Sequence, residues 1–382
     1  MEYQELKECA KYSNLRTSTF TKDTYISTEN MLPNKGGVTS IDSIPTCKTT
    51  AKYEPADILI SNIRPYFCKI WFATREGGCS NDVLVIKAKK TIEPKFLYYV
   101  LSDKNFFNYD TITSKGTKMP RGNKNAIMKY LVPKFSPLTQ QKIASILSSY
   151  DRLIENNTRR IRLLEQMAEN LYKEWFSYRK IKGQSTAIKL KEIINITRGL
   201  SYSSEEIDCT DGNNLINLKN IQGYGGFRLD GTKLYNGKYK PEQIVEEGDL
   251  IMGVTDMTQD RRTVGSVALI PNVNTLSVIS ADLVKINSSI DNTYLYAMFR
   301  YGNVSSHIAQ FANGANVLHL RPKSILNIKV FLPNQDIIDS FVSKVKPMIQ
   351  LTNRLNTEID SLTRQRDLLL PRLMSGKLEV NS

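Results

Sequence analysis

Two stretches of the chain carry hydrophobic residues at alternating spacings of three and four, which is typical of a helix with one apolar seam. The first seam contains Ile154, Asn157, Ile161, Leu164, Ala168, Leu171 and Trp175. The second contains Thr352, Leu355, Ile359, Leu362, Arg366, Leu369 and Leu373. Each seam runs over about three heptads with Arg, Glu and Lys on the other faces, so the pattern predicts a coiled coil within one chain.

The simpler alternative is that each helix covers the core of its own domain, and the pattern leaves this open. Arg366 in the seam and Pro371 in the last turns depart from the repeat and indicate an imperfect or partner-facing end. The residues that we select for helix pairing and partner binding are the apolar seam positions Ile154, Ile161, Leu164, Leu171, Trp175, Leu355, Ile359, Leu362, Leu369 and Leu373.

Both helical stretches follow a proline, Pro133 or Pro333, and start with residues that cap helices, Thr139-Gln140-Gln141 and Asn334-Gln335-Asp336. Beyond a short break, the matching residues of the two stretches lie three positions further apart. We therefore expect a short helix, a joint near Asp151 or Pro347, and then a long helix in each stretch.

The chain is a tandem duplication with a period of about 195 residues. Leu6-Lys7-Glu8 matches Leu190-Lys191-Glu192, and Asp57-Ile58-Leu59-Ile60 matches Asp249-Leu250-Ile251-Met252. Gly116 matches Gly314. Two copies of one architecture with divergent details suggest two domains that do the same job on different targets, although drift after duplication would leave the same trace.

The segments before each helical stretch are rich in strands. Short β-branched runs such as Asp82-Val83-Leu84-Val85-Ile86 and Ser266-Val267-Ala268-Leu269-Ile270 alternate with turn residues and occasional short helices. We predict an α+β fold: a duplicated, strand-rich mixed α/β recognition domain, each copy followed by helices. The expected domains are 1–137 and 183–332, with helical spacers at 138–182 and 333–382.

Composition narrows the choice of partner. Lys and Arg number 52 against 38 Asp and Glu, and a net charge of +14 on a globular chain points to a polyanion, with nucleic acid ahead of an anionic membrane surface. No apolar run approaches the roughly 18 residues of a membrane span and no signal peptide opens the chain, so we expect a cytoplasmic protein. The five cysteines (Cys9, Cys47, Cys68, Cys79 and Cys209) form no CxxC pair and suggest reduced, structural thiols.

The sequence lacks the motifs of the enzymes that act on DNA. The chain has only two histidines, His307 and His319, so few residues are available for a His-based zinc site or a Ser/His/Asp triad. Gly223-Tyr224-Gly225-Gly226 lacks the lysine and hydroxyl of an ATP-binding loop and is better read as a turn. No Asn-Pro-Pro-Tyr or Asp-Pro-Pro-Tyr stretch holds a flipped adenine. Asp57 and Asp249 suit a strand-entry turn better than a nuclease metal site, so we predict no catalytic residue, metal or cofactor.

Equivalent polar and basic loops stand just upstream of the helices in both copies. Base edges require donors and acceptors among cations that contact phosphates. In the first copy the candidates are Arg64, Tyr66, Lys115, Thr117, Lys118, Arg121, Asn123 and Lys124. In the second they are Asp256, Gln259, Arg261, Arg262, Asn313, Asn316, His319 and Arg321, followed by Lys323. For any single residue, a solvated basic loop is an equally good interpretation.

Two segments resemble the helical spacers of type I restriction-modification specificity subunits. The run from Leu138 to Leu147, with Asp151, Ile154 and the stretch Leu164 to Phe176, resembles the central spacer. Arg366 to Gly376, which includes Pro371, is similar to the C-terminal spacer, and Lys189 to Ile193 with Thr197-Arg198-Gly199 fits the domain opening. The first copy has Lys11-Tyr12-Ser13-Asn14 at the latter position, a departure from the second.

The resemblance implies two target-recognition domains held apart by an antiparallel pair of long helices. It further implies two methyltransferase subunits docked on the helices, with S-adenosylmethionine bound by them, and restriction subunits in the complete complex. A helix from about Asp151 to Tyr178 would span roughly 40 Å, close to one turn of B-DNA, and would act as a ruler. We therefore expect a non-catalytic subunit that reads a bipartite, asymmetric site in double-stranded DNA. A protein assembly scaffold with an incidental basic surface is the alternative.

Overall fold

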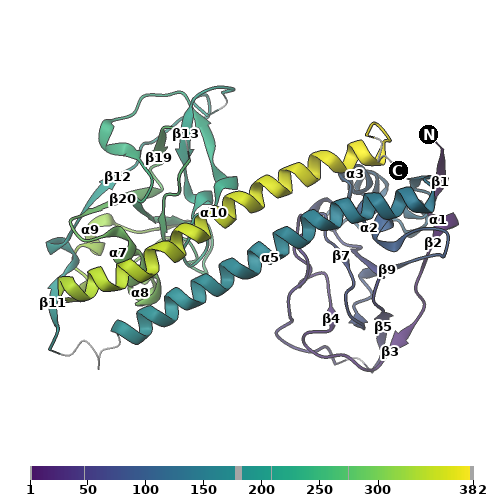
Figure 1. Cartoon of the computed structure of the whole chain (residues 1–382), viewed down its shortest axis with the longest axis horizontal. Helices are drawn as coiled ribbons and strands as arrows, with labels where there is room; N and C mark the ends of the chain where they lie inside the picture. Colours follow the sequence, from purple (N-terminus) through teal and green to yellow (C-terminus); the bar gives the residue numbers. More distant parts are fainter. Residues whose placement is uncertain (1, 47, 177–182, 208, 274, 379–382) are drawn as a thin grey trace. The chain divides into compact units, whose positions relative to one another are not determined.

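The computed structural model describes residues 2–46, 48–176, 183–207, 209–273 and 275–378. The chain divides into two compact units: unit 1 contains residues 1–153 and 362–382, and unit 2 contains residues 154–361. Two helices of 40 residues each contribute to both units, α5 (Pro137–Phe176) and α10 (Gln335–Met374) (Figure 1). Each unit therefore combines one strand-rich segment with part of both long helices.

Unit 1 contains two four-stranded sheets and one separate strand pair. The first sheet has the order β2 (Ala10–Tyr12), β9 (Val83–Ala88), β6 (Ile58–Ser61) and β7 (Ile70–Phe72). The second has the order β3 (Arg16–Thr17), β5 (Thr50–Tyr53), β8 (Gly77–Cys79) and β4 (Tyr25–Ile26). Strand β1 (Tyr3–Glu5) pairs with β10 (Leu131–Pro133). The short helices are α1 (Leu6–Cys9), η1 (Pro65–Phe67), α2 (Pro94–Ser102), α3 (Lys104–Thr113) and α4 (Lys124–Ile127).

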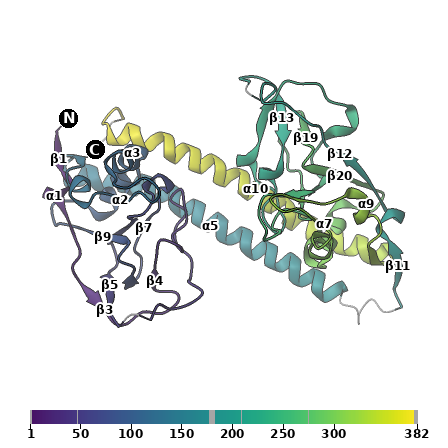
Figure 2. The same cartoon turned by 180° about the vertical axis from the view of Figure 1, so that it is seen from behind.

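Unit 2 likewise contains two four-stranded sheets, together with two separate strand pairs (Figure 2). One sheet has the order β12 (Ile194–Arg198), β20 (Leu283–Ser288), β16 (Leu250–Gly253) and β18 (Val267–Leu269), and the other has β14 (Lys233–Tyr235), β13 (Asn213–Ile216), β19 (Ser277–Ile279) and β15 (Ile244–Val245). Strand β11 (Ser185–Lys189) pairs with β22 (Lys329–Pro333), and β17 (Thr255–Asp256) with β21 (Leu318–His319). The helices are η2 (Leu190–Glu192), η3 (Leu218–Asn220), η4 (Leu229–Gly231), η5 (Pro241–Gln243), α7 (Asn292–Tyr301), α8 (Val304–Ala309) and α9 (Pro322–Ile325).

The predicted α+β fold with a tandem duplication is confirmed by the equivalent order of the antiparallel sheets β2-β9-β6-β7 and β12-β20-β16-β18 and by the turns that precede equivalent strands. The Asp57 carboxylate accepts from the Glu54 N–H at 2.9 Å immediately before β6. The Asp249 carboxylate accepts from the Glu246 N–H at 2.8 Å immediately before β16. Both aspartates thus close the strand-entry turns that the sequence predicts.

The ends of the long helices belong to the cores of the two units. In unit 1, Ile143 and Leu147 of α5 and Leu370 and Leu373 of α10 are buried with the sheet and α2. In unit 2, the end of α5 and the start of α10 bury Tyr172, Phe176, Ile338 and Phe341 against α7. The alternative that each helix covers the core of its own domain is therefore correct for the start of each helix, whereas the end of each helix packs in the core of the other copy.

The helices also pair with each other, and within unit 2 they run in opposite directions. The Phe341 ring lies 4.9 Å from that of Phe176 and 6.0 Å from that of Trp175. Earlier on α5 and later on α10, Leu164 and Thr352 line one small cavity. The order along α5 is thus the reverse of the order along α10, as in an antiparallel coiled coil.

The selected seam positions face inward. Leu355 and Leu373 are buried, and the remaining eight are half-buried: Ile154, Ile161, Leu164, Leu171, Trp175, Ile359, Leu362 and Leu369. Apolar residues just off the seam are far more open, with Leu163 47%, Met167 50% and Leu368 58% exposed. The spacing of three and four therefore identified the buried face correctly.

The expected joint within each helical stretch is wrong. Helix α5 continues through Asp151, and α10 continues through Pro347 without interruption. Three extra residues are close to one helical turn of 3.6, so a helix absorbs them with a small change of face and needs no break. Pro347 is exposed, which lets its ring project away from the packed side. The end of the expected central spacer, 177–182 with Tyr178, and the last residues of the C-terminal spacer, 379–382, lie outside the described residues.

Candidate nucleic-acid interface

In unit 1, hydrogen bonds bring the segment after β6 against the loop that follows α3. The Lys115 and Arg121 backbones exchange two hydrogen bonds of 2.9 Å, which close the loop 115–121. The Arg64 N–H donates to the Pro120 carbonyl at 2.8 Å, and the Gly122 N–H donates to the Asn62 carbonyl at 2.9 Å. The structure therefore places Arg64 beside the Lys115 loop, although about 50 residues separate them in the sequence.

Most of the candidate side chains of unit 1 are exposed. Lys115, Thr117, Lys118 and Lys124 are exposed, and Tyr66 is 49% exposed with its ring 4.8 Å from that of Phe67. Arg121 pairs with Asp82 at 3.2 Å while its side chain stays 58% exposed. Arg64 has the left-handed backbone that opens the short helix η1, with φ of 51°.

Asn123 differs from the other candidates of this unit. Its side-chain oxygen accepts from the N–H groups of Asn125 at 3.1 Å and Ala126 at 3.3 Å, so it caps helix α4. The Asn123 side chain is half-buried and its oxygen is directed into the chain. A polar residue before a short helix has the same sequence signature whether it caps the helix or faces a ligand.

Unit 2 repeats the same hydrogen-bonded frame with other residues. Asn313 and His319 exchange backbone hydrogen bonds of 3.0 and 2.9 Å, as Lys115 and Arg121 do in unit 1. The Leu320 N–H donates to the Val254 carbonyl at 2.8 Å, as that of Gly122 does to Asn62. Both units thus close a loop with equivalent backbone hydrogen bonds and place different side chains on it.

The two candidate loops of unit 2 contact each other. Strands β17 and β21 pair, and the Gln259 amide donates to the Ala315 carbonyl at 3.0 Å. Gln259, Arg261 and Arg262 are exposed, and Arg262 forms an exposed ion pair of 2.7 Å with Asp260. The remaining candidates Asn313, Asn316, His319 and Arg321 are exposed too, as is Lys323.

Asp256 lies inside its loop, with 2% of its surface exposed. One carboxylate oxygen accepts from the N–H and the hydroxyl of Thr258, both at 2.8 Å, and the other accepts from the Thr263 N–H at 2.6 Å. Burial raises the pKa of Asp256, but these hydrogen bonds outweigh it and hold the pKa below its ordinary value. Asp256 therefore shapes the loop 256–263, and the exposed residues around it carry the contacts available to a ligand.

A buried polar cluster supports the loop of unit 1. Asp110 of α3 is fully buried, Asn62 is 8% exposed, and a Cβ on Gly122 would lie 2.7 Å from a carboxylate oxygen of Asp110. Among the described residues, neither Asp110 oxygen has a hydrogen-bond partner, and nor does the side-chain oxygen of Asn62. Burial raises the pKa of Asp110 from 3.8 to about 7. No local sequence pattern points to this cluster, because a lone aspartate in a helix is usually solvated.

The described residues offer little other chemistry. They hold no group of three or more His, Cys, Asp or Glu side chains that could bind a metal ion. Among them, no helix has both the length and the apolar character required to cross a membrane. Cys9 and Cys79 are buried, and burial raises the pKa of the Cys9 thiol to about 11, which keeps it protonated; Cys47 lies outside the described residues.

Comparison with known proteins identifies the class. Residues 3–166 match the family described as the type I restriction modification DNA specificity domain. The MjaIX specificity subunit of a type I restriction enzyme from Methanocaldococcus jannaschii is 24% identical over 317 residues, which cover 76% of this chain and 71% of that protein. The HindI specificity subunit from Haemophilus influenzae is 22% identical, and the match covers 93% of this chain and 94% of that protein.

A solved structure supports the fold over the whole chain. The S subunit of a type I restriction-modification system from M. genitalium superposes with a TM-score of 0.62 at 16% identity, covering 97% of this chain and 95% of that one. Residues 3–166 thus match a type I restriction-modification DNA specificity domain, and most of the chain is similar to type I restriction enzyme specificity subunits. The relatives named above are specificity subunits of type I restriction enzymes. The resemblance seen in the sequence is thereby confirmed.

Proposed function

We propose that each unit reads one half of a bipartite, asymmetric site in double-stranded DNA. The single observation that supports this most is the shared frame, in which equivalent backbone hydrogen bonds hold Lys115 and Arg121 in one unit and Asn313 and His319 in the other. Identical frames with different side chains suit two readers of different sequences, because base edges are read by side-chain donors and acceptors.

The proposal divides the chain as the sequence suggests. The target-recognition domains are 1–137 and 183–332, and the helical spacers are 138–182 and 333–382. Two methyltransferase subunits would dock on the helices and supply the chemistry on the adenines, and restriction subunits would join them. The protein would act in the cytoplasm, where the DNA of a bacterium or archaeon is found.

The candidate contacts fall into two groups under this proposal. The exposed cations Arg64, Lys115, Lys118, Arg121 and Lys124 would contact phosphates and bases of the first half-site, with Tyr66 and Thr117 beside them. Gln259, Arg261, Arg262, Asn313, Asn316, His319 and Arg321 would read the second half-site. Asn123 and Asp256 would act indirectly, because their side chains hold the loops in shape.

A salt titration of DNA binding tests the proposal against the scaffold alternative. The complex with its methyltransferase subunits is titrated with duplex DNA containing the motif whose methylation disappears when the gene is deleted. The triple variant Lys115→Ala/Lys118→Ala/Arg121→Ala should weaken binding and flatten the slope of log affinity against log salt, by about 0.9 for each phosphate that is no longer neutralised. The matched control replaces Lys90, Lys129 and Lys134, three exposed lysines of the same unit outside the loops, with alanine.

An unchanged slope in the triple variant would remove the loop from the interface. Little binding by the wild-type complex at any salt concentration would favour the scaffold. Disappearance of a single contiguous methylated motif on gene deletion would contradict the bipartite site.

A further inference from the structure

A third loop of unit 2, the turn Gln222 to Phe227, presents one tyrosine on the surface. The Gln222 N–H donates to the Gly226 carbonyl and the Gly225 N–H to the Gln222 carbonyl, both at 2.9 Å. Tyr224 is 68% exposed and has a φ of 67°, in the left-handed region where a residue with a side chain is strained. Strained positions of this kind often coincide with functional sites.

This turn is attached to a loop that already contains candidate DNA contacts. The Tyr224 N–H donates to the Arg262 carbonyl at 2.8 Å, and the Gly226 N–H donates to the Val267 carbonyl at 2.9 Å. Tyr224 therefore stands next to two exposed arginines, Arg261 and Arg262. An exposed tyrosine among cations suits a duplex-DNA interface, because its hydroxyl can donate to a phosphate or sugar oxygen while the cations neutralise phosphates.

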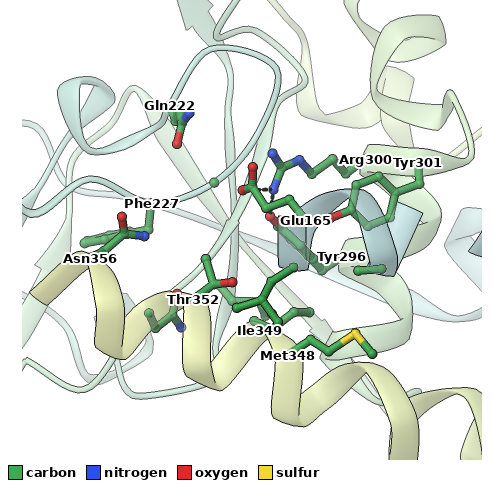
Figure 3. Close-up of a pocket in the computed structure, with 15 residues that line it drawn as sticks. Glu165, Gln222, Phe227, Tyr296, Arg300, Tyr301, Met348, Ile349, Thr352 and Asn356 are labelled. Carbon is green, nitrogen blue, oxygen red and sulfur yellow. Dashed lines mark hydrogen bonds and ion pairs between the residues drawn. The ribbon is translucent and has the colours of Figure 1, made fainter. Parts of the chain in front are cut away.

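A half-buried ion pair lies against the turn (Figure 3). The Arg300 guanidinium of α7 contacts the Glu165 carboxylate of α5 at 2.9 Å and also bonds the Tyr296 hydroxyl. The Arg300 side chain is 14% exposed. A Cβ on Gly225 would lie 3.1 Å from the Arg300 Cδ, so the turn rests directly on this side chain.

Resting on the proposed function, we infer that Tyr224 is a DNA-contact residue of the half-site read by unit 2. Arg300 and Glu165 act as positioning residues that hold the turn beside the loop that contains Arg262. The chain of contacts from Glu165 through Arg300 and Gly225 to Tyr224 ties this contact to the long helix α5. The glycines of the turn predict only its backbone shape, whereas the structure adds an exposed ring beside two cations.

Binding measurements with Tyr224→Ala and Tyr224→Phe test the contact. The complete complex with its methyltransferase subunits is titrated with the cognate duplex and with duplexes in which either half-site is scrambled. Tyr224→Ala should lower the affinity for the cognate duplex about tenfold, as expected for the loss of one base-edge or phosphate contact. The loss should persist when the first half-site is scrambled and vanish when the second is scrambled.

Tyr224→Phe then separates the ring from the hydroxyl, and Tyr239→Ala, an exposed tyrosine outside the three loops, is the matched control. An affinity of Tyr224→Ala within twofold of the wild type would overturn the inference while leaving the proposed function intact. A wild-type complex that binds cognate and scrambled duplexes equally would overturn the proposed function itself.

The positioning role is tested by a double-mutant cycle with Glu165→Gln. Glu165→Gln keeps a hydrogen-bond acceptor but removes the charge opposite Arg300, so it disturbs the support with little change in volume. It should weaken binding in the wild-type background and have no further effect in the Tyr224→Ala background. Equal losses in both backgrounds would show that Glu165 does not act through Tyr224, and a melting curve of each variant confirms that it is folded.

Discussion

The residues beneath the frame loops differ in character between the two copies. Unit 1 has Asn62 and Gly122 in its frame, with the buried Asp110 beside them. Unit 2 has Val254 and Leu320 at the positions equivalent to Asn62 and Gly122, in one apolar cluster with the buried Ile308 of α8. The apolar set is satisfied by packing alone, whereas the polar set leaves buried oxygens without partners among the described residues. The residues beneath the loop of unit 1 are therefore expected to contribute less to the free energy of unfolding than those beneath the loop of unit 2.

Asp110→Asn should stabilise unit 1 at alkaline pH. The pKa of Asp110 is raised from 3.8 to about 7 by burial, so between about pH 4 and 7 the folded chain keeps a proton that the unfolded chain has released. The free energy of unfolding therefore falls as the pH rises through this window and levels off above it. At about 1.36 kcal/mol per pKa unit, Asp110 lowers the free energy of unfolding by at most about 4 kcal/mol at pH 8, and by nearly zero at pH 4.

Urea unfolding at pH 4, 6 and 8 measures this effect, with Asp42→Asn on an exposed aspartate as the control. The wild type should lose stability between pH 4 and 8 relative to Asp110→Asn, and the control should follow the wild type. Parallel curves for the wild type and Asp110→Asn would mean that Asp110 is ionised in the folded protein across the range.

At the scale of the residue, the sequence predicts exposure well where exposure follows from residue type, and poorly where a polar group is used internally. Lys115, Lys118 and Arg262 are charged residues in Gly-containing loops, and the structure leaves them exposed as such residues usually are. Asp256 and Asn123 have the same local sequence character, yet their oxygens accept hydrogen bonds from backbone N–H groups. Tyr224 was missed because its conformation and its contact with Arg262 depend on residues 38 positions apart (262 against 224).

At the scale of the element, Pro347 interrupts neither helix geometry nor packing, but it removes one backbone donor from α10. Pro347→Ala would restore the N–H that bonds the carbonyl four residues earlier, and alanine has the highest helix propensity. The exposed site leaves room for the change. We expect a rise in the free energy of unfolding of about 1–3 kcal/mol, measured by urea denaturation.

The control for this prediction is Pro137→Ala, at the first residue of α5. A backbone N–H at this position has no acceptor within the helix, so little is gained by restoring it. That variant should change stability much less. A destabilised Pro347→Ala would mean that α10 needs its proline for a bend that helps packing.

Arg366 is the polar interruption of the second seam, and its partners explain its place. Its guanidinium contacts the Asp151 carboxylate of α5 at 2.8 Å and that of Asp367 at 2.9 Å, and the Tyr99 hydroxyl donates to Asp151 at 2.5 Å. The side chains of Arg366 and Asp151 are 19% and 26% exposed. The departure from the heptad is therefore a salt bridge between the two helices inside unit 1.

Arg366→Met should lower the free energy of unfolding by about 1–3 kcal/mol, because it leaves the Asp151 charge poorly solvated with one hydroxyl donor. Arg364→Met, on an exposed arginine two residues earlier, is the control and should change stability by less than about 0.5 kcal/mol. The additional change Asp151→Leu should recover much of the loss in the Arg366→Met background. An Arg366→Met variant as stable as the wild type would show that the pair contributes nothing net.

For the whole molecule, periodicity and repetition predicted the architecture because both are properties of the sequence itself. The seam from Ile154 to Trp175 and the match of Asp57 with Asp249 led to two helices and two copies of one domain. The sequence did not show which part of each helix packs on which copy of the domain. Whether Ile143 packs on the first copy and Phe176 on the second depends on contacts with residues far along the chain, such as Leu373 and Tyr294.

Under the proposed function, the long helices would set the distance between the two half-sites. Changing the length of the helices tests this. Inserting one heptad into each long helix at the boundary between the units, after Leu153 in α5 and before Leu362 in α10, keeps the seam in register. Seven residues add about 10.5 Å at 1.5 Å per residue, which is about three base pairs of B-DNA at 3.4 Å each. The unread gap in the methylated motif should therefore lengthen by about three base pairs with both half-sites unchanged. Methylome mapping in cells that carry the variant measures the gap. An insertion in α5 alone breaks the pairing and should abolish methylation, whereas an unchanged gap in the double insertion would show that the helices do not set the spacing.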